Sequence, residues 1–197
     1  MPTLFDTVYC KSIPVHCIEG NHDVDHRDSR RDRGGGRSRD PRRPRGTLAD
    51  LVTVIHPDAT NREASAEPPA TRGRGPQAFH ATGEWLREAF SDLTWTTERS
   101  IAEGDLVVTF GTMSGRHTGN FVVWTKDATV ERVFVPTGKT FSVRQAHFQR
   151  IRDGLVIEHW AVRDDQGMAL QAGWIPPTPA FLIRCALATR KARRAHS

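Results

Sequence analysis

Long segments of alternating polar and apolar residues fill the second half of the chain and restrict its fold most strongly. Residues 94–115 predict two strands joined by a turn at 103–105, and residues 141–165 predict a second hairpin that turns at 152–154. Gly and Asp at these two points are typical of tight hairpin turns. Strands joined by such turns run antiparallel, so the sequence predicts an antiparallel sheet.

Helical periodicity appears on either side of these strands. Apolar residues at helical spacing predict a short helix over 48–55 that ends before Pro57. A second helix is expected to begin at Pro76 and end at 91–92, and a third to cover 165–172. Two helices, then long strands, then a late helix indicate the α+β class, with helices on one face of a curved sheet. The chain lacks βαβ alternation and a Gly-rich phosphate loop, which disfavours dinucleotide- and P-loop-type folds.

The positive charge of the chain lies at its two ends. The formal net charge is +5, yet residues 47–183 carry three more acidic than basic side chains. We therefore expect no nucleic-acid partner for the folded domain. RNA binding through an Arg-rich end is kept as an alternative.

Residues 1–46 are predicted to form a disordered extension rich in Arg, Asp, Gly and Pro. Residues 26–46 contain no apolar side chain other than proline, so they cannot bury enough surface to offset the entropy of ordering. The group formed by Cys10, Cys17, His22 and His26 lacks the short Cys-x2–4-Cys spacing of zinc sites. No metal or other cofactor is expected.

The other end, residues 181–197, is predicted to be a basic tail. Its apolar front and basic rear also fit a helix lying on an anionic membrane, but a solvated tail is the simpler interpretation, and no membrane partner is expected. Three cysteines, no secretory signal and no long apolar run favour a cytoplasmic protein.

Two rows of side chains alternate along the first strand of the last hairpin. If the row that holds Gln145 and His147 faces inward, an amide and an imidazole lie close together in a pocket. The opposite row holds Ala146 and Phe148, so the reverse orientation is open, and a curved sheet can also bury part of both rows.

Short motifs in a fixed order resemble those of the SnoaL-like polyketide and ester cyclases. They include HPD at 56–58, EGD at 103–105, PTG at 136–138 and EHW at 158–160. The resemblance implies a cone-shaped α+β fold with an internal pocket over residues 47–180. It also implies aldol-type ring closure of a bulky hydrophobic carbonyl compound, a small-molecule substrate, by side-chain acid/base chemistry without metal or cofactor. A homodimer formed through the open sheet face is compatible with this fold.

The same resemblance suggests which residues carry the chemistry. Gln145 and His147 match the family's polar pair, as orienting donor and as base or donor. The family's acid/base Asp falls at Ala161 in this chain, so Asp164 is the nearest candidate acid/base. The candidate substrate-binding residues are Asn61, Trp85, His117, His159 and Trp160, each of which could equally be a loop, core or wall residue.

Two departures from the family pattern keep other functions open. Ala161 favours a non-catalytic protein that binds a hydrophobic ligand in the same pocket, and a hydrolase, isomerase or dehydratase is also compatible with the fold. The family's opening helix has no counterpart in residues 1–46, which are interpreted as a divergent extension or as a start displaced by a frame error. Without that helix, we expect a monomer of low solubility.

Overall fold

The computed structural model describes residues 46–196, and its main feature is a curved five-stranded sheet with strand order β1-β7-β6-β3-β2. β1 runs parallel to β7, and the other neighbours are antiparallel. A separate two-stranded sheet pairs β4 with β5. The strands are β1 (Ile55–Asn61), β2 (Phe90–Glu103), β3 (Leu106–His117), β4 (Phe121–Trp124), β5 (Val130–Phe134), β6 (Thr140–Arg152) and β7 (Leu155–Arg163).

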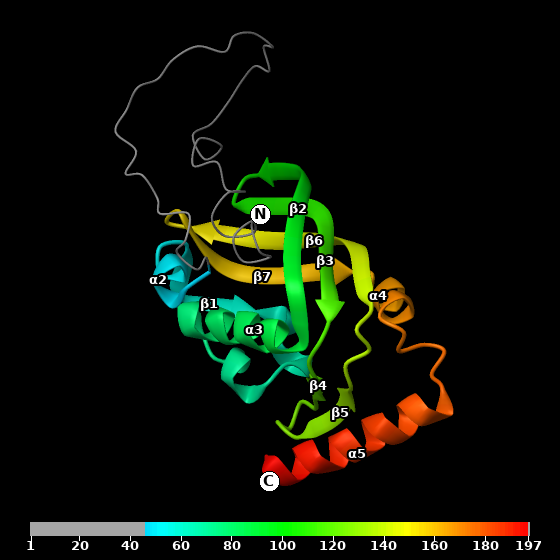
Figure 1. Cartoon of the computed structure of the whole chain (residues 1–197). Coiled ribbons are helices and arrows are strands. Elements are labelled where there is room, and N and C mark those ends of the chain that lie inside the picture. The colour runs from blue at the N-terminus through cyan, green and yellow to red at the C-terminus, as the bar shows by residue number, and fades with distance from the viewer. Residues whose placement is uncertain (1–45, 197) are drawn as a thin grey trace.

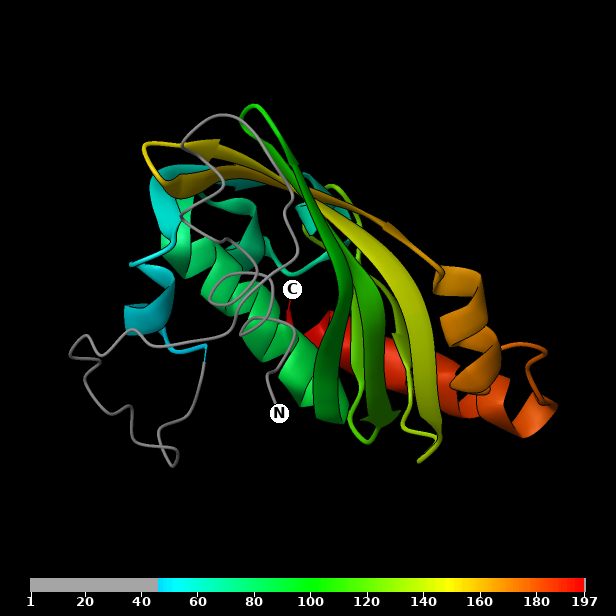
Figure 2. The same ribbon diagram turned by 90° about the horizontal axis from the view of Figure 1, so that it is seen from above.

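Helices cover the concave side and the ends of this sheet (Figures 1 and 2). The strands curve around α3, which packs on β1, while α4 contacts β6 and α5 contacts β5. The helices are α2 (Leu48–Leu51), η3 (Arg62–Ala66), η4 (Pro69–Arg72), α3 (Gly75–Ala89), α4 (Asp165–Gln171) and α5 (Pro179–Ala195). This architecture confirms the α+β class predicted from the sequence.

The predicted hairpins form, whereas several predicted ends shift. Asp153 and Gly154 take φ angles of 53° and 76°, as the two central residues of a type I′ turn require. The first helix is shorter than expected, since β1 already begins at Ile55. β2 begins at Phe90, directly after α3, so the chain passes from helix to strand without a loop.

The core lies between α3 and the concave face of the sheet. Its fully buried side chains include Trp95, Phe79, Phe90, Leu51 and Ile55. On β6, the row that contains Gln145 and His147 is buried, and the row that contains Phe148 faces outward. The structure thus selects the inward orientation of the polar pair.

The segment predicted as a basic tail, either helical or frayed, forms helix α5, which is held on the small sheet. Thr189 Oγ1 of α5 accepts a hydrogen bond of 2.8 Å from the backbone of Val133, and Arg193 Nε donates to the Val130 carbonyl at 2.9 Å. Cys185 is the buried residue of α5. Nowhere in residues 46–196 is a helix long and apolar enough to cross a membrane. The predicted extension, apart from Gly46, and its Cys/His group lie outside the described residues.

We expect Gly119→Ala to destabilise the protein by about 1–3 kcal/mol, because an added side-chain carbon has no space there. The Gly119 backbone donates to the Ala89 carbonyl at the end of α3, and a Cβ would overlap the carbonyl oxygen of Glu88. Urea unfolding would measure the change. Gly73→Ala is the matched control, because its Cβ would meet only the Ala78 side chain at 3.9 Å. A control as unstable as Gly119→Ala would contradict the steric argument.

Candidate functional site

A cavity of about 290 Å³ lies between the concave face of the sheet, η3, α3 and α4. Its wall is largely apolar and includes Trp85, Phe90, Phe121 and Trp174. Polar side chains converging in an apolar cavity are typical of ligand and active sites. The polar side chains of the lining are Asn61, Glu63, Glu67, Thr82, Gln145, His147, His159, Arg163 and Asp165.

A larger hollow of about 810 Å³ lies between α5 and β5. Its wall is mostly apolar, and its charged groups are arginines and Glu131. Trp174 contributes to both hollows and stacks on Phe134 with 4.4 Å between ring centroids. The larger hollow has no imidazole or buried carboxyl in its lining, so the acid/base groups belong to the smaller cavity.

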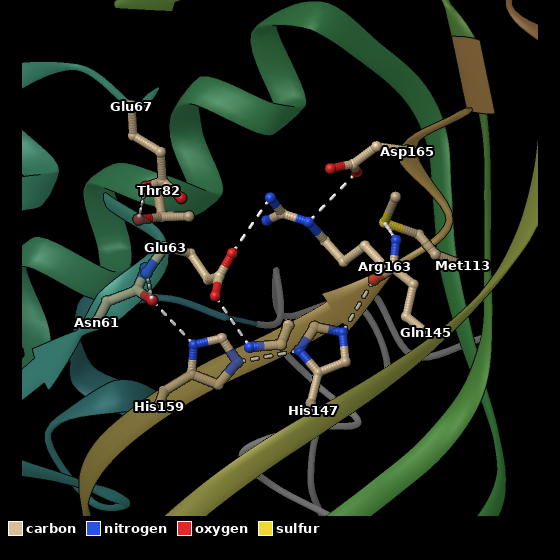
Figure 3. A network of polar contacts seen from close by, with 11 residues as sticks. Asn61, Glu63, Glu67, Thr82, Met113, Gln145, His147, His159, Arg163 and Asp165 are labelled. Carbon is tan, nitrogen blue, oxygen red and sulfur yellow. Dashed lines mark hydrogen bonds and ion pairs between the residues drawn. The ribbon is translucent and has the colours of Figure 1, made fainter. Parts of the chain in front are cut away.

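Two buried imidazoles form the centre of a row of hydrogen bonds (Figure 3). His159 Nδ1 lies 3.0 Å from Asn61 Oδ1, and His159 Nε2 lies 3.0 Å from His147 Nδ1. His147 Nε2 in turn lies 2.9 Å from the Gln145 amide oxygen. The strand register explains the row, because Gln145 and His147 are two residues apart on β6 and His159 of β7, which pairs with Gln149, is a diagonal neighbour of His147.

Both imidazoles are neutral in this site. Burial lowers the pKa of His159 from its ordinary value of 6.5 to about 3, with a further contribution from the Arg163 charge. Burial, then His159 and Arg163, hold the pKa of His147 well below 6.5. Each ring therefore carries one proton and one lone pair.

The position of these protons follows from Asn61. Its amide oxygen also accepts a hydrogen bond of 3.1 Å from the backbone of Glu63, where Asn61 caps η3. The oxygen is thus fixed toward His159, and His159 Nδ1 must donate its proton to it. His159 Nε2 then accepts from His147 Nδ1, and His147 Nε2 retains a lone pair.

Gln145 is the adaptable end of the row. Its amide nitrogen donates only to the sulfur of Met113, at 3.7 Å, which is a weak acceptor. A half-turn of the amide therefore costs little and lets its N–H group donate to the lone pair of His147 Nε2. A ligand that reaches this lone pair would free the same N–H group for another oxygen.

Charged groups form the side of the cavity above the imidazoles (Figure 3). Arg163 pairs with Glu63 at 3.2 Å and with Asp165 at 3.4 Å. The second oxygen of Glu63 accepts a hydrogen bond of 3.1 Å from the backbone of Ala161. A carboxylate from η3 thus contacts the strand at Ala161, whose own side chain is only a methyl group.

Glu67 supplies a second carboxyl on the opposite wall. Its side chain is 4% exposed, and Thr82 Oγ1 of α3 donates to it at 2.6 Å. Burial raises the pKa of Glu67, and this effect exceeds the lowering by Thr82, Thr71 and Arg163. The cavity therefore has a neutral base on the sheet and a carboxyl that tends to keep its proton near α3.

Five of the eight residues selected from the sequence line this cavity, and three do not. The five are Gln145, His147, Asn61, His159 and Trp85. Asp164 is exposed and caps α4, where its carboxylate accepts from Gly167 at 2.7 Å. Its expected role as the acid/base of the pocket does not fit this position, because β7 ends at Arg163 and the carboxylate is used by the helix.

Trp160 and His117, which were expected to bind substrate, lie outside the lining of the cavity. Trp160 stacks on Phe148 on the outer face of the sheet, with the Arg62 guanidinium 4.7 Å from its ring centroid. His117 is fully buried and accepts a hydrogen bond of 3.2 Å from Trp174 Nε1. It supports the wall of the cavity through Trp174 without lining it.

Sequence reasoning missed Glu63, Glu67 and Arg163. Arg163 could have been found, since it is four residues after His159 on the same strand and therefore on the same face. Glu63 lies in η3 and Glu67 directly follows it, in a segment without a hydrophobic period that could assign a direction to a side chain. Among residues 46–196, no group of three or more His, Cys, Asp and Glu side chains is arranged to hold a metal ion.

Known proteins resemble this chain in sequence and in fold. The family model of the SnoaL-like polyketide cyclases matches residues 43–172. The chain is 34% identical over 135 residues to the aklanonic acid methyl ester cyclase DnrD of Streptomyces peucetius. The matched residues make up 68% of this chain and 85% of that protein. It is also 33% identical over 133 residues to the nogalonic acid methyl ester cyclase of Streptomyces nogalater, with 65% of this chain and 87% of that protein matched.

A solved structure shares the fold. TsrD from Streptomyces laurentii superimposes with a TM-score of 0.52 at 26% identity, over 65% of this chain and 84% of that one. The match of the family model extends over more than half of the chain, and two curated relatives are 33–34% identical to it over about two thirds of its length. The chain therefore belongs to the SnoaL-like polyketide cyclase family.

Proposed function

We propose that this protein closes a ring in a polyketide-type ester by an intramolecular aldol reaction, with neutral His147 as the base. The lone pair of His147 Nε2 carries the proposal, because the row that ends at Asn61 fixes its place in the cavity. The names of the relatives, which specify methyl esters of aklanonic and nogalonic acid, support a substrate of that class.

The reaction requires a proton to leave the carbon next to a carbonyl group. His147 Nε2 takes this proton, and the resulting positive charge is shared with His159 through their common hydrogen bond. The Gln145 amide, no longer bound to the lone pair, donates to the enolate oxygen. The enolate carbon then forms a C–C bond to a second carbonyl carbon of the same molecule, whose oxygen accepts a proton.

Glu63 helps to offset the charge that the base acquires. The resemblance to the family implies an acid/base carboxylate at position 161, where this chain has alanine. Glu63 directs its carboxylate to the Ala161 backbone and lies between Arg163 and the imidazoles (Figure 3). A negative group there stabilises an imidazolium by Coulomb attraction in a low-dielectric cavity.

A non-catalytic binding protein is the second candidate. Ala161 favours it, because the side chain at this point of the strand cannot exchange a proton. Incubation with aklanonic and nogalonic acid methyl esters separates the two functions. A cyclised product supports the enzyme, whereas a raised melting temperature without product supports the binding protein.

We expect His147→Gln to lower kcat by about 100-fold or more, since general base catalysis contributes that much, while ligand affinity is kept. Product formation and the ligand-induced shift in melting temperature measure the two effects separately. His80→Gln is the matched control, because His80 lies on α3 and pairs with Glu84 outside the cavity lining. Equal turnover by both variants would eliminate His147 as the base. Asp164→Asn should also retain turnover.

The acid limb of kcat/KM should lie below pH 6.5, because only neutral His147 acts and its folded pKa is held below that value. Arg163→Gln removes a positive charge that lowers the pKa of both imidazoles, so the limb should move to higher pH. Arg62→Gln, on the outer face, should leave the limb in place. A wild-type limb at or above pH 6.5 would argue that another group is the base.

A further inference from the structure

The wall that faces the imidazole row contains an acid held apart from every cation that could pair with it. Glu67 follows η3, and its carboxyl lies in the cavity lining with 4% exposure. Arg72 is near in sequence, but its guanidinium donates to the backbone carbonyls of Glu67, Thr125 and Lys126. Arg163 is paired with Glu63 and Asp165. None of the ion pairs of the described residues includes Glu67.

Two threonine hydroxyls contact the Glu67 carboxyl, and they lower its pKa less than burial raises it. Thr82 Oγ1 donates to Oε2 at 2.6 Å, which makes Oε2 the carbonyl oxygen and leaves the proton on Oε1. Thr71 also interacts with this carboxyl, and its hydroxyl donates to the Pro68 carbonyl at 2.8 Å. Burial in an apolar wall can keep a carboxylic acid neutral near pH 7.

We propose that Glu67 is the general acid of the ring closure and delivers its Oε1 proton to the oxygen of the carbonyl group that is attacked. This inference rests on the proposed function, in which His147 removes the carbon-bound proton on the opposite wall. As the C–C bond forms, the carbonyl π electrons move to oxygen, and that oxygen takes the proton from Glu67. The products are a hydroxyl group, the Glu67 carboxylate and the His147 imidazolium. Transfer of the imidazolium proton to the carboxylate through solvent restores both groups.

The arrangement distributes the two proton transfers over two walls for a physical reason. A single group cannot hold the removed proton and supply another at a second carbonyl in the same step. The charges around Glu67 are those of Arg163 and Glu63, and they act in opposite directions on its pKa. Burial therefore decides its protonation, and a substrate that fills the cavity and removes water would strengthen that effect.

The test compares Glu67→Gln with His147→Gln on the full chain, using aklanonic acid methyl ester as the probe. Glutamine keeps the size of the side chain and an oxygen for Thr82, so a purely structural role would survive the substitution. We expect the melting temperature and the ligand affinity of Glu67→Gln to be unchanged. Its kcat should be lower than that of the wild type by about 100-fold or more. Infrared spectra of the wild type at neutral pH should show the carbonyl stretch of a protonated carboxylic acid, absent in Glu67→Gln.

Each other outcome separates the two proposals. If Glu67→Gln turns over normally while His147→Gln does not, the Glu67 proposal is wrong and the proposed function stands. If both variants turn over normally, or the wild type forms no product, the proposed function fails and this inference fails with it. If Glu67→Gln does not fold, the infrared spectrum of the wild type still decides, because a missing protonated-acid band overturns the proposal.

Discussion

The amide oxygen of Asn61 is the acceptor on which the polar site depends. It receives the backbone N–H group of Glu63 at the start of η3 and the Nδ1 proton of His159 from β7. One atom thus joins the end of β1 to the strand beside it and sets the direction of each proton in the row. The lone pair of His147 faces the cavity because the hydrogen bonds can be satisfied in this direction when both rings are neutral.

Burial, more than pairing with charges, sets the chemistry of the cavity. It lowers the pKa of both imidazoles and raises the pKa of Glu67, so an uncharged base and an uncharged acid can face each other. Arg163, which pairs with Glu63 and Asp165 at the side of the cavity, lowers the pKa of both imidazoles further and also lowers the pKa of Glu67. Exclusion of water favours the neutral forms of these groups, because desolvation raises the free energy of a charged group far more than that of a hydrogen-bonded neutral group.

Much of the fold could be predicted because hydrophobic period and turn chemistry are local. The hairpin at Asp153 and Gly154, and the shared face of Gln145 and His147, follow from alternation and from residues that tolerate positive φ. Asp164 shows where local reasoning fails. Its chemistry suits an acid/base role, but the strand ends one residue earlier and the carboxylate becomes a helix cap. Trp160 fails for a related reason, since its aromatic face packs outward on Phe148.

By itself, the sequence determined the α+β class, the antiparallel hairpins and the pairing of an amide with an imidazole on one strand, because these depend on neighbours within a few residues. The tertiary structure decided which face of that strand lines the cavity, and it brought Asn61, Glu63 and Glu67 to it from segments without a period. It also decided the protonation of His147 and His159. Burial depends on contacts between residues far apart in the chain, and no local pattern records how many of them enclose a given side chain.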